Sequence, residues 1–356
     1  VVHGVGGAGK THLAAELAHR LADEGWYGGF LTRHAGPDDL EWLAGVVSPL
    51  LVVVDYPEDV RAEAVISLLQ ALSGREEPAC VILTARVLGG WWKEITGSLD
   101  RDAIPYTAFP PLVLPRRHPS TTGVFQRALR AFAQLPGMTP ATVTTPPPDR
   151  RWTTLDLVML AWLAAQGAAA LPTSRDRLYD EILDREFEYW VRVCWRRGMA
   201  DPPGHLLPAV GACVTLLAPT LDRVEPALRA VEAFDGENKW RHEIAAVVEM
   251  LLPPDSDAGT VAVYPDPVGE RLVLRMLGAD STFLRRCLIR ANDEERVNAC
   301  LTITRATERD EPGAAALAVA VLADQPELWR PALAVVEAQG GPFEAPLLTL
   351  ADRDDS

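Results

Sequence analysis

The sequence predicts an α/β domain with a doubly wound parallel sheet at its start, followed by helical modules. Residues 50–55 and 79–84 form almost continuously apolar runs, which are typical of parallel strands buried on both faces. Helical patterns alternate with these runs over residues 1–115, and the apolar spacing is mainly helical from Trp152 onward. A chain of 356 residues is long enough for two or three domains with cores of their own.

The first domain is predicted from alternating strand and helix signals. Leu13, Leu17 and Leu21 recur every four residues, with Ala14 and Ala18 beside them, and predict one apolar helix face. In chain order, the predicted elements are a strand tail at 1–3, that first helix, a short strand at 28–33, a helix at 37–47, a strand at 50–55, a helix at 62–72, a strand at 79–84 and a fifth strand at 112–114.

The remaining chain is predicted to be mostly helical. The predicted domains are 1–115, 116–204, 205–278 and 279–356. A Pro- and Thr-rich stretch at 136–148 predicts an exposed loop or hinge within the second of them. Residues 260–264 alternate like an edge strand in the third, and the Ala-rich fourth resembles the start of a helical repeat array.

The octapeptide Gly4–Thr11 fits the phosphate-binding pattern G-x-x-x-x-G-K-[ST] and predicts that the chain binds a nucleoside triphosphate. Its glycines let backbone N–H groups turn inward, Lys10 is placed to meet the β and γ oxygens, and Thr11 offers a hydroxyl to Mg²⁺. The residues predicted to contact the nucleotide are Gly4, Gly6, Gly7, Ala8, Gly9, Lys10, Thr11 and His12. The alternative is a glycine-rich turn without a ligand, but the strand before it and the helix after it favour an anion site at a helix N-terminus.

A carboxylate at the end of a buried strand is the second part of such a site. Asp55 ends the apolar run at 50–55 and is predicted to hold the Mg²⁺ shell together with Thr11. The alternative is an acidic residue that ends a core strand for solubility. Many hydrolases place a second acid directly after this aspartate, but Tyr56 follows here. Glu58 is the candidate catalytic base, with a helix N-terminal acid as its alternative role, so slow hydrolysis or binding without turnover is expected.

Arg86 follows the strand at 79–84 and is a candidate sensor of the γ-phosphate. Its alternative role is a surface arginine in a salt bridge. The predicted catalytic set is therefore Lys10, Arg86 and Glu58. The paired Trp91 and Trp92 nearby are expected to pack in a core or lid more often than to bind a partner.

Composition excludes several classes of function. The net charge of −15 argues against strong non-specific binding to nucleic acid or to an anionic membrane. The five cysteines are scattered and form no C-x-x-C pair, so neither a disulfide framework nor a zinc site is indicated. Without an apolar run long enough to cross a bilayer and without a signal peptide, a cytoplasmic protein is expected. The excess of arginine over lysine is typical of a GC-rich bacterial genome.

Taken together, Gly4–Thr11, Leu51–Asp55 and Thr84–Arg86 resemble the STAND class of signalling NTPases, which includes NB-ARC and NACHT modules. The bacterial branch of that class is also similar in Asp55–Glu58 and in the Leu183–Trp190 helix. The resemblance implies a P-loop domain, a helical domain, a winged-helix domain at 205–278, and sensor or repeat helices after them. It also implies ATP, ADP and Mg²⁺ as ligands.

In that class, ADP holds the domains closed, and ATP exchange releases them to form oligomers and to activate a fused effector. The winged-helix motif that contacts ADP is Met-His-Asp, and the nearest stretch here is Tyr264–Val268. Asp266 is thereby implied as a further nucleotide contact, whereas Pro265 stands in place of the histidine.

The sequence therefore predicts a nucleotide-dependent molecular switch with slow Mg²⁺-dependent ATP hydrolysis. Because the chain begins within a strand, effector and sensor domains are expected outside it. A homo-oligomer is expected in the ATP-bound state, without membrane or nucleic-acid partners. The alternatives are a small-molecule kinase of the P-loop type and a noncatalytic interaction scaffold that keeps a bound nucleotide.

Overall fold

The computed structural model describes residues 1–354 except 33–34, 58–61, 139–141, 149–151, 200–203, 235–238, 255–258, 280–281 and 308–313. The chain divides into two compact units, Val1–Arg175 and Asp176–Ser356. The division falls inside the range 116–204, for which the sequence predicts a helical domain.

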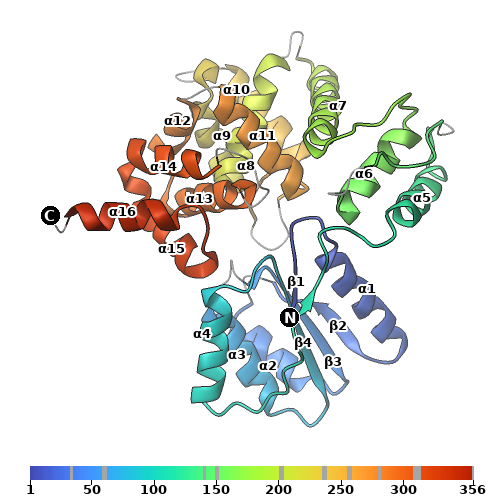
Figure 1. The fold of residues 1–356 in the computed structure, drawn as a ribbon, viewed down its shortest axis with the longest axis vertical. Helices are drawn as coiled ribbons and strands as arrows, with labels where there is room; N and C mark the ends of the chain where they lie inside the picture. The colour runs from blue at the N-terminus through green and yellow to red at the C-terminus, as the bar shows by residue number, and fades with distance from the viewer. Residues whose placement is uncertain are drawn as a thin grey trace. The chain divides into compact units, whose positions relative to one another are not determined.

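The first unit contains a five-stranded sheet with the order β2-β3-β4-β1-β5 (Figure 1). Every pairing between neighbouring strands in this sheet is parallel. The strands are β1 (Val2–His3), β2 (Tyr27–Phe30), β3 (Leu50–Asp55), β4 (Ala79–Ala85) and β5 (Leu112–Val113). Since the strands are parallel, β1, β3 and β4 all end at the same edge of the sheet. The predicted α/β domain with a parallel sheet is confirmed.

Helices cover both faces of this sheet. They are α1 (Lys10–Asp23), α2 (Pro37–Gly45), α3 (Ala62–Ser73) and α4 (Gly90–Arg101). Two further helices of this unit, α5 (Thr121–Phe132) and α6 (Thr154–Ala165), pack against each other. Figure 1 shows α1 on one side of the sheet and α2, α3 and α4 on the other. The described residues of the Pro- and Thr-rich stretch at 136–148 form neither helix nor strand, as expected.

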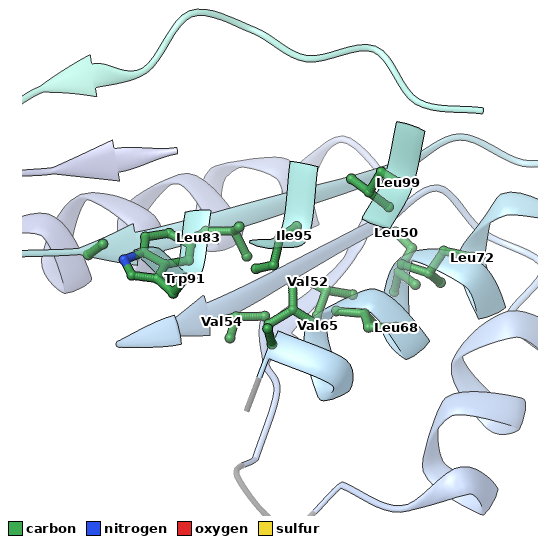
Figure 2. Packing of buried hydrophobic residues seen from close by; sticks show 12 residues of the cluster. Leu50, Val52, Val54, Val65, Leu68, Leu72, Leu83, Trp91, Ile95 and Leu99 are labelled. Atoms are coloured by element: carbon green, nitrogen blue, oxygen red, sulfur yellow. The ribbon is translucent and has the colours of Figure 1, made fainter. Parts of the chain in front are cut away.

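The alternation of side chains along β3 explains why both faces need a cover. Leu50, Val52 and Val54 pack in one core cluster with residues of α3 and α4, whereas Leu51 and Val53 pack with α1 on the opposite face. Figure 2 shows the first cluster, with Val65, Leu68 and Leu72 from α3 and Trp91, Ile95 and Leu99 from α4. Each fully buried side chain of this size contributes roughly 1.5–3 kcal/mol. Trp91 is a core residue, as expected for the tryptophan pair.

The buried face of α1 differs from the predicted face. Ala14, Ala18 and Leu21 pack towards the sheet, whereas Leu13 and Leu17 remain 40% and 36% exposed. The reason is a close approach of helix and sheet: a Cβ on Gly28 of β2 would lie 3.4 Å from the Cβ of Ala18. Only a small side chain fits at that point of the interface, so Leu13 and Leu17 lie on the outer side of the helix, while Leu21 packs near its end.

The second unit is helical in the residues that the structure describes. Its helices are α7 (Arg175–Arg196), α8 (Leu207–Leu217), α9 (Leu221–Ala227), α10 (Lys239–Leu251), α11 (Asp266–Ala279), α12 (Phe283–Ile289), α13 (Asp293–Thr307), α14 (Ala314–Asp324), α15 (Trp329–Gln339) and α16 (Glu344–Asp354). Apart from Pro208, every residue of α8 is buried, and this helix packs against α11 and α13. The helical prediction for 279–356 is confirmed where those residues are described.

The predicted edge strand at 260–264 is wrong in extent. Only Thr260 forms an antiparallel bridge, with Thr220. The N–H group of Val263 donates instead to the hydroxyl of Thr215, at 3.1 Å, because this segment lies against α8 rather than beside a second strand. Among the described residues, no helix is both long enough and apolar enough to cross a membrane.

Candidate functional site

A glycine-rich loop connects β1 to α1 at the edge where the strands end. We call Gly4–Gly9 the glycine loop. The N–H group of Gly4 donates to the carbonyl of Ala85, which ends β4, at 3.2 Å, and Gly9 is the N-cap of α1. A Cβ on Gly4 would lie 2.7 Å from the carbonyl oxygen of Leu114. The first glycine is therefore required by the close passage of the chain after β5.

The N-terminus of α6 holds the middle of the glycine loop. The N–H group of Leu155 donates to the carbonyl of Gly7 at 3.1 Å, and the hydroxyl of Thr154 donates to the carbonyl of Ala8 at 3.3 Å. Gly7 has a φ of +81°, and a Cβ there would lie 3.0 Å from the hydroxyl oxygen of Thr153. These hydrogen bonds direct the carbonyls of Gly7 and Ala8 towards α6. No sequence pattern around the loop indicates this role of α6.

The start of α6 is set by a capping box. The N–H group of Asp156 donates to the Thr153 hydroxyl at 3.2 Å, and the N–H group of Thr153 donates to the Asp156 carboxylate at 2.7 Å. Asp156 is fully buried and forms an ion pair with Arg175, with 2.9 Å between Oδ2 and Nε. A buried carboxylate needs such partners. The pattern T-x-x-D was the sequence signal that could have revealed this helix start.

Lys10 occupies the base of the glycine loop. Its side chain is only 4% exposed, and Nζ donates to the carbonyls of Gly4 at 2.8 Å and Val5 at 3.3 Å. A buried ammonium group beside a helix N-terminus favours a negatively charged ligand. His12, two residues further on, is exposed.

Thr11 and Asp55 meet, as the sequence predicted for two residues of one site. The Thr11 hydroxyl donates to Oδ2 of Asp55 at 2.9 Å. The hydroxyl of Thr84, a fully buried residue of β4, donates to Oδ1 of the same carboxylate. Hydroxyl and carboxylate oxygens are ligands that Mg²⁺ accepts. Within the described part of the chain, no group of three or more His, Cys, Asp and Glu residues gathers into a metal cluster.

Tyr56 and Arg86 complete this edge of the sheet. Nζ of Lys10 lies over the Tyr56 ring at 5.9 Å from its centroid, and Cζ of Arg86 lies over the same ring at 5.8 Å. Arg86 is 4% exposed, and a Cβ on Gly6 would lie 3.6 Å from its guanidinium group. Arg86 is thus packed against the glycine loop instead of extending into solvent.

A cavity of about 290 Å³ adjoins the carboxylate end of β3. Its lining includes Asp55, Thr32 and Ser67 among otherwise apolar or small residues of β3, α2, α3 and the segment between β2 and α2. The cavity therefore borders Asp55 with mainly apolar walls. No single sequence pattern indicates it, because its walls come from separate elements.

The roles of two further predicted site residues stay predictions. Glu58 lies outside the described residues. Asp266 begins α11 in the second compact unit.

No protein-family model matches this chain, and no curated protein matches it.

Proposed function

We propose that this chain is an ATP- and ADP-binding molecular switch of the STAND signalling or defence type, with slow Mg²⁺-dependent ATP hydrolysis. The observation that carries the proposal is the 2.9 Å hydrogen bond between Thr11 and Asp55, which are 44 positions apart in the chain. An Mg²⁺ ion between a nucleotide and the protein needs a hydroxyl and a carboxylate at this place, directly after the glycine loop.

The charges around the glycine loop support a polyanionic ligand. Lys10 and Arg86 are both 4% exposed and lie beside the loop, in a chain whose net charge is −15. Buried cations in an acidic protein are costly unless an anion or an acceptor compensates them. Phosphate oxygens would replace the carbonyls of Gly4 and Val5 as acceptors for Lys10.

Two features favour a switch over a fast enzyme. Tyr56, which is no general base at neutral pH, directly follows Asp55, so the position where many hydrolases carry an acid is aromatic. The chain also folds as two compact units, and rotation of one unit against another is one of the ways in which a ligand-controlled switch works. Opening of the units and assembly of an ATP-bound homo-oligomer belong to this proposal.

Isothermal titration calorimetry with ATP and ADP tests the proposal. Lys10→Ala should weaken binding of both nucleotides by about 10- to 100-fold, because it removes charge-assisted hydrogen bonds. The matched control is Lys93→Ala, which removes an exposed lysine on α4 of the same unit. Replacing Mg²⁺ by EDTA should weaken ATP binding to the wild type much more than to Asp55→Asn. A folded wild-type chain without affinity for either nucleotide would refute the proposal.

A second candidate is a scaffold that keeps its nucleotide permanently and does not turn it over. Tyr56 after Asp55 is the observation that favours it. Acid extraction of the purified protein identifies any retained nucleotide, and phosphate release is then followed over hours. Retained ADP with slow release of phosphate supports the switch, whereas retained ATP without release supports the scaffold.

A further inference from the structure

Tyr56 has an unusual backbone for a residue with a large side chain. Its φ is +54°, in the left-handed region that residues other than glycine rarely adopt. The N–H group of Tyr56 donates to the carbonyl of Thr84 at 2.9 Å, which holds the turn directly after Asp55. Such strained conformations persist where surrounding contacts enforce them, and they concentrate at functional sites.

The turn brings the Tyr56 ring to two cations from two different elements. Lys10 comes from the start of α1 and Arg86 from the end of β4, and both lie within 6 Å of the ring centroid. Two positive side chains at one site repel each other, and the negative π face of an aromatic ring offsets part of that cost. A glycine or asparagine would adopt this backbone with less strain but would provide no ring.

The two cations lie on either side of the glycine loop. Lys10 donates to the carbonyls of Gly4 and Val5, inside the base of the loop, and keeps these acceptors when the ring is removed. Arg86 lies across the loop at Gly6, where the ring links it to the strand end that carries Asp55. Removing the ring should therefore leave Lys10 in place and loosen the link between Arg86 and this strand end.

We infer that Tyr56 is a positioning residue that holds Arg86 over the glycine loop, where it contacts the terminal phosphate of a nucleoside triphosphate. This inference rests on the proposed nucleotide binding. Because a diphosphate lacks that terminal group, the arrangement makes the site discriminate ATP from ADP. Lys10 binds both nucleotides, and Arg86, placed by Tyr56, adds affinity for ATP alone.

Affinities for ATP and ADP in Mg²⁺, measured for variants of Tyr56, test this inference. Tyr56→Phe keeps the ring and should keep the ratio of the two affinities within about twofold. Tyr56→Asn removes the ring and tolerates the backbone; it should lower ATP affinity by about 2- to 30-fold and leave ADP affinity nearly unchanged. Tyr56→Gly is a second ring-free variant in case the asparagine variant does not fold. Tyr106→Asn, in the same unit, controls for loss of a half-exposed tyrosine.

A double-mutant cycle with Arg86→Gln separates positioning from general disturbance. If the ring acts through Arg86, the ratio of ATP affinity to ADP affinity should be no smaller in the double variant Tyr56→Asn/Arg86→Gln than in Arg86→Gln alone. Independent, additive losses would overturn the inference, and so would an unchanged ratio in Tyr56→Asn or an equal loss in Tyr56→Phe. Lack of any nucleotide binding by the wild type would instead refute the proposed function.

Discussion

At the scale of single residues, Gly7 is constrained both by its backbone conformation and by its close contact with α6. Its φ is +81°, which strains any side chain, and α6 passes so close that a Cβ would lie 3.0 Å from the hydroxyl oxygen of Thr153 and 3.1 Å from the Cβ of Leu155. Gly25 has a similar φ of +86° but no atom within 4 Å of the place of its Cβ. Alanine substitutions at Gly7 and Gly25 therefore separate the energetic cost of a positive φ from the cost of a close contact with α6.

We predict that Gly7→Ala destabilises the chain more than Gly25→Ala does. The backbone cost, about 1–2 kcal/mol, applies to both variants, whereas displacement of α6 applies only to the first. Urea unfolding measures the difference. Calorimetry should show weaker nucleotide binding for Gly7→Ala alone, since the carbonyls of Gly7 and Ala8 would leave α6. Equal effects of the two variants would contradict a role for the close approach.

At the scale of elements, α6 depends on a buried carboxylate at its start. Asp156 caps the helix through Thr153 and pairs with Arg175, the first residue of α7. Removal of one partner leaves a charge uncompensated in the interior, a change that typically costs about 3–5 kcal/mol. The ion pair between Asp156 and Arg175 therefore connects α6, whose N-terminus contacts the glycine loop, with the last residue of the first compact unit.

We expect Asp156→Ala to lower the free energy of unfolding by roughly 3–5 kcal/mol. Glu16→Ala is the comparison, because Glu16 pairs with Arg20 in an exposed ion pair on α1, and such pairs contribute at most about 1 kcal/mol. Denaturant unfolding of both variants beside the wild type gives the two values. A loss for Asp156→Ala no larger than that for Glu16→Ala would show that the ion pair and the cap do not hold α6.

The sequence predicted elements better than the contacts between them. The limits of β3 were predicted to the residue, because a single run of apolar side chains after Pro49 ends at a charged residue. Thr11 and Asp55 were assigned to one magnesium site from the phosphate-loop pattern and from the acid at the end of a buried strand, and the structure places the two side chains in contact. The hydrogen bond from Thr154 to Ala8 spans 146 positions, and no local pattern reports a contact at that separation. The exposure of Leu13 likewise follows from the close approach of α1 to Gly28 of β2, which no local pattern reports.

At the scale of the whole molecule, the proposed binding of a nucleotide requires an acidic chain to attract an anion. The net charge is −15, so attraction depends on the local arrangement of Lys10, Arg86 and the N-terminus of α1 rather than on the overall field. The surface keeps its acidic character while the site is cationic. Binding should therefore be specific to the loop, with little adsorption of other anions elsewhere.

The stability of the whole chain should also depend on pH at the alkaline side, through Cys300 of α13. Burial raises the pKa of its thiol to about 12, whereas an exposed cysteine has a pKa of about 8.5. Between these values, the unfolded chain loses the thiol proton and the folded chain keeps it. The stabilising contribution of this group is therefore complete below about pH 8.5 and is lost as the pH rises towards 12.

Cys300→Ala removes this dependence and serves as the test. The free energy of unfolding of the wild type should fall between pH 8 and pH 11 by on the order of 3 kcal/mol more than that of the variant. The variant itself is less stable than the wild type at neutral pH, because the smaller side chain leaves a cavity; the quantity of interest is the difference in slope. Parallel curves for the two proteins would mean that the Cys300 thiol ionises in the folded chain as readily as in the unfolded one.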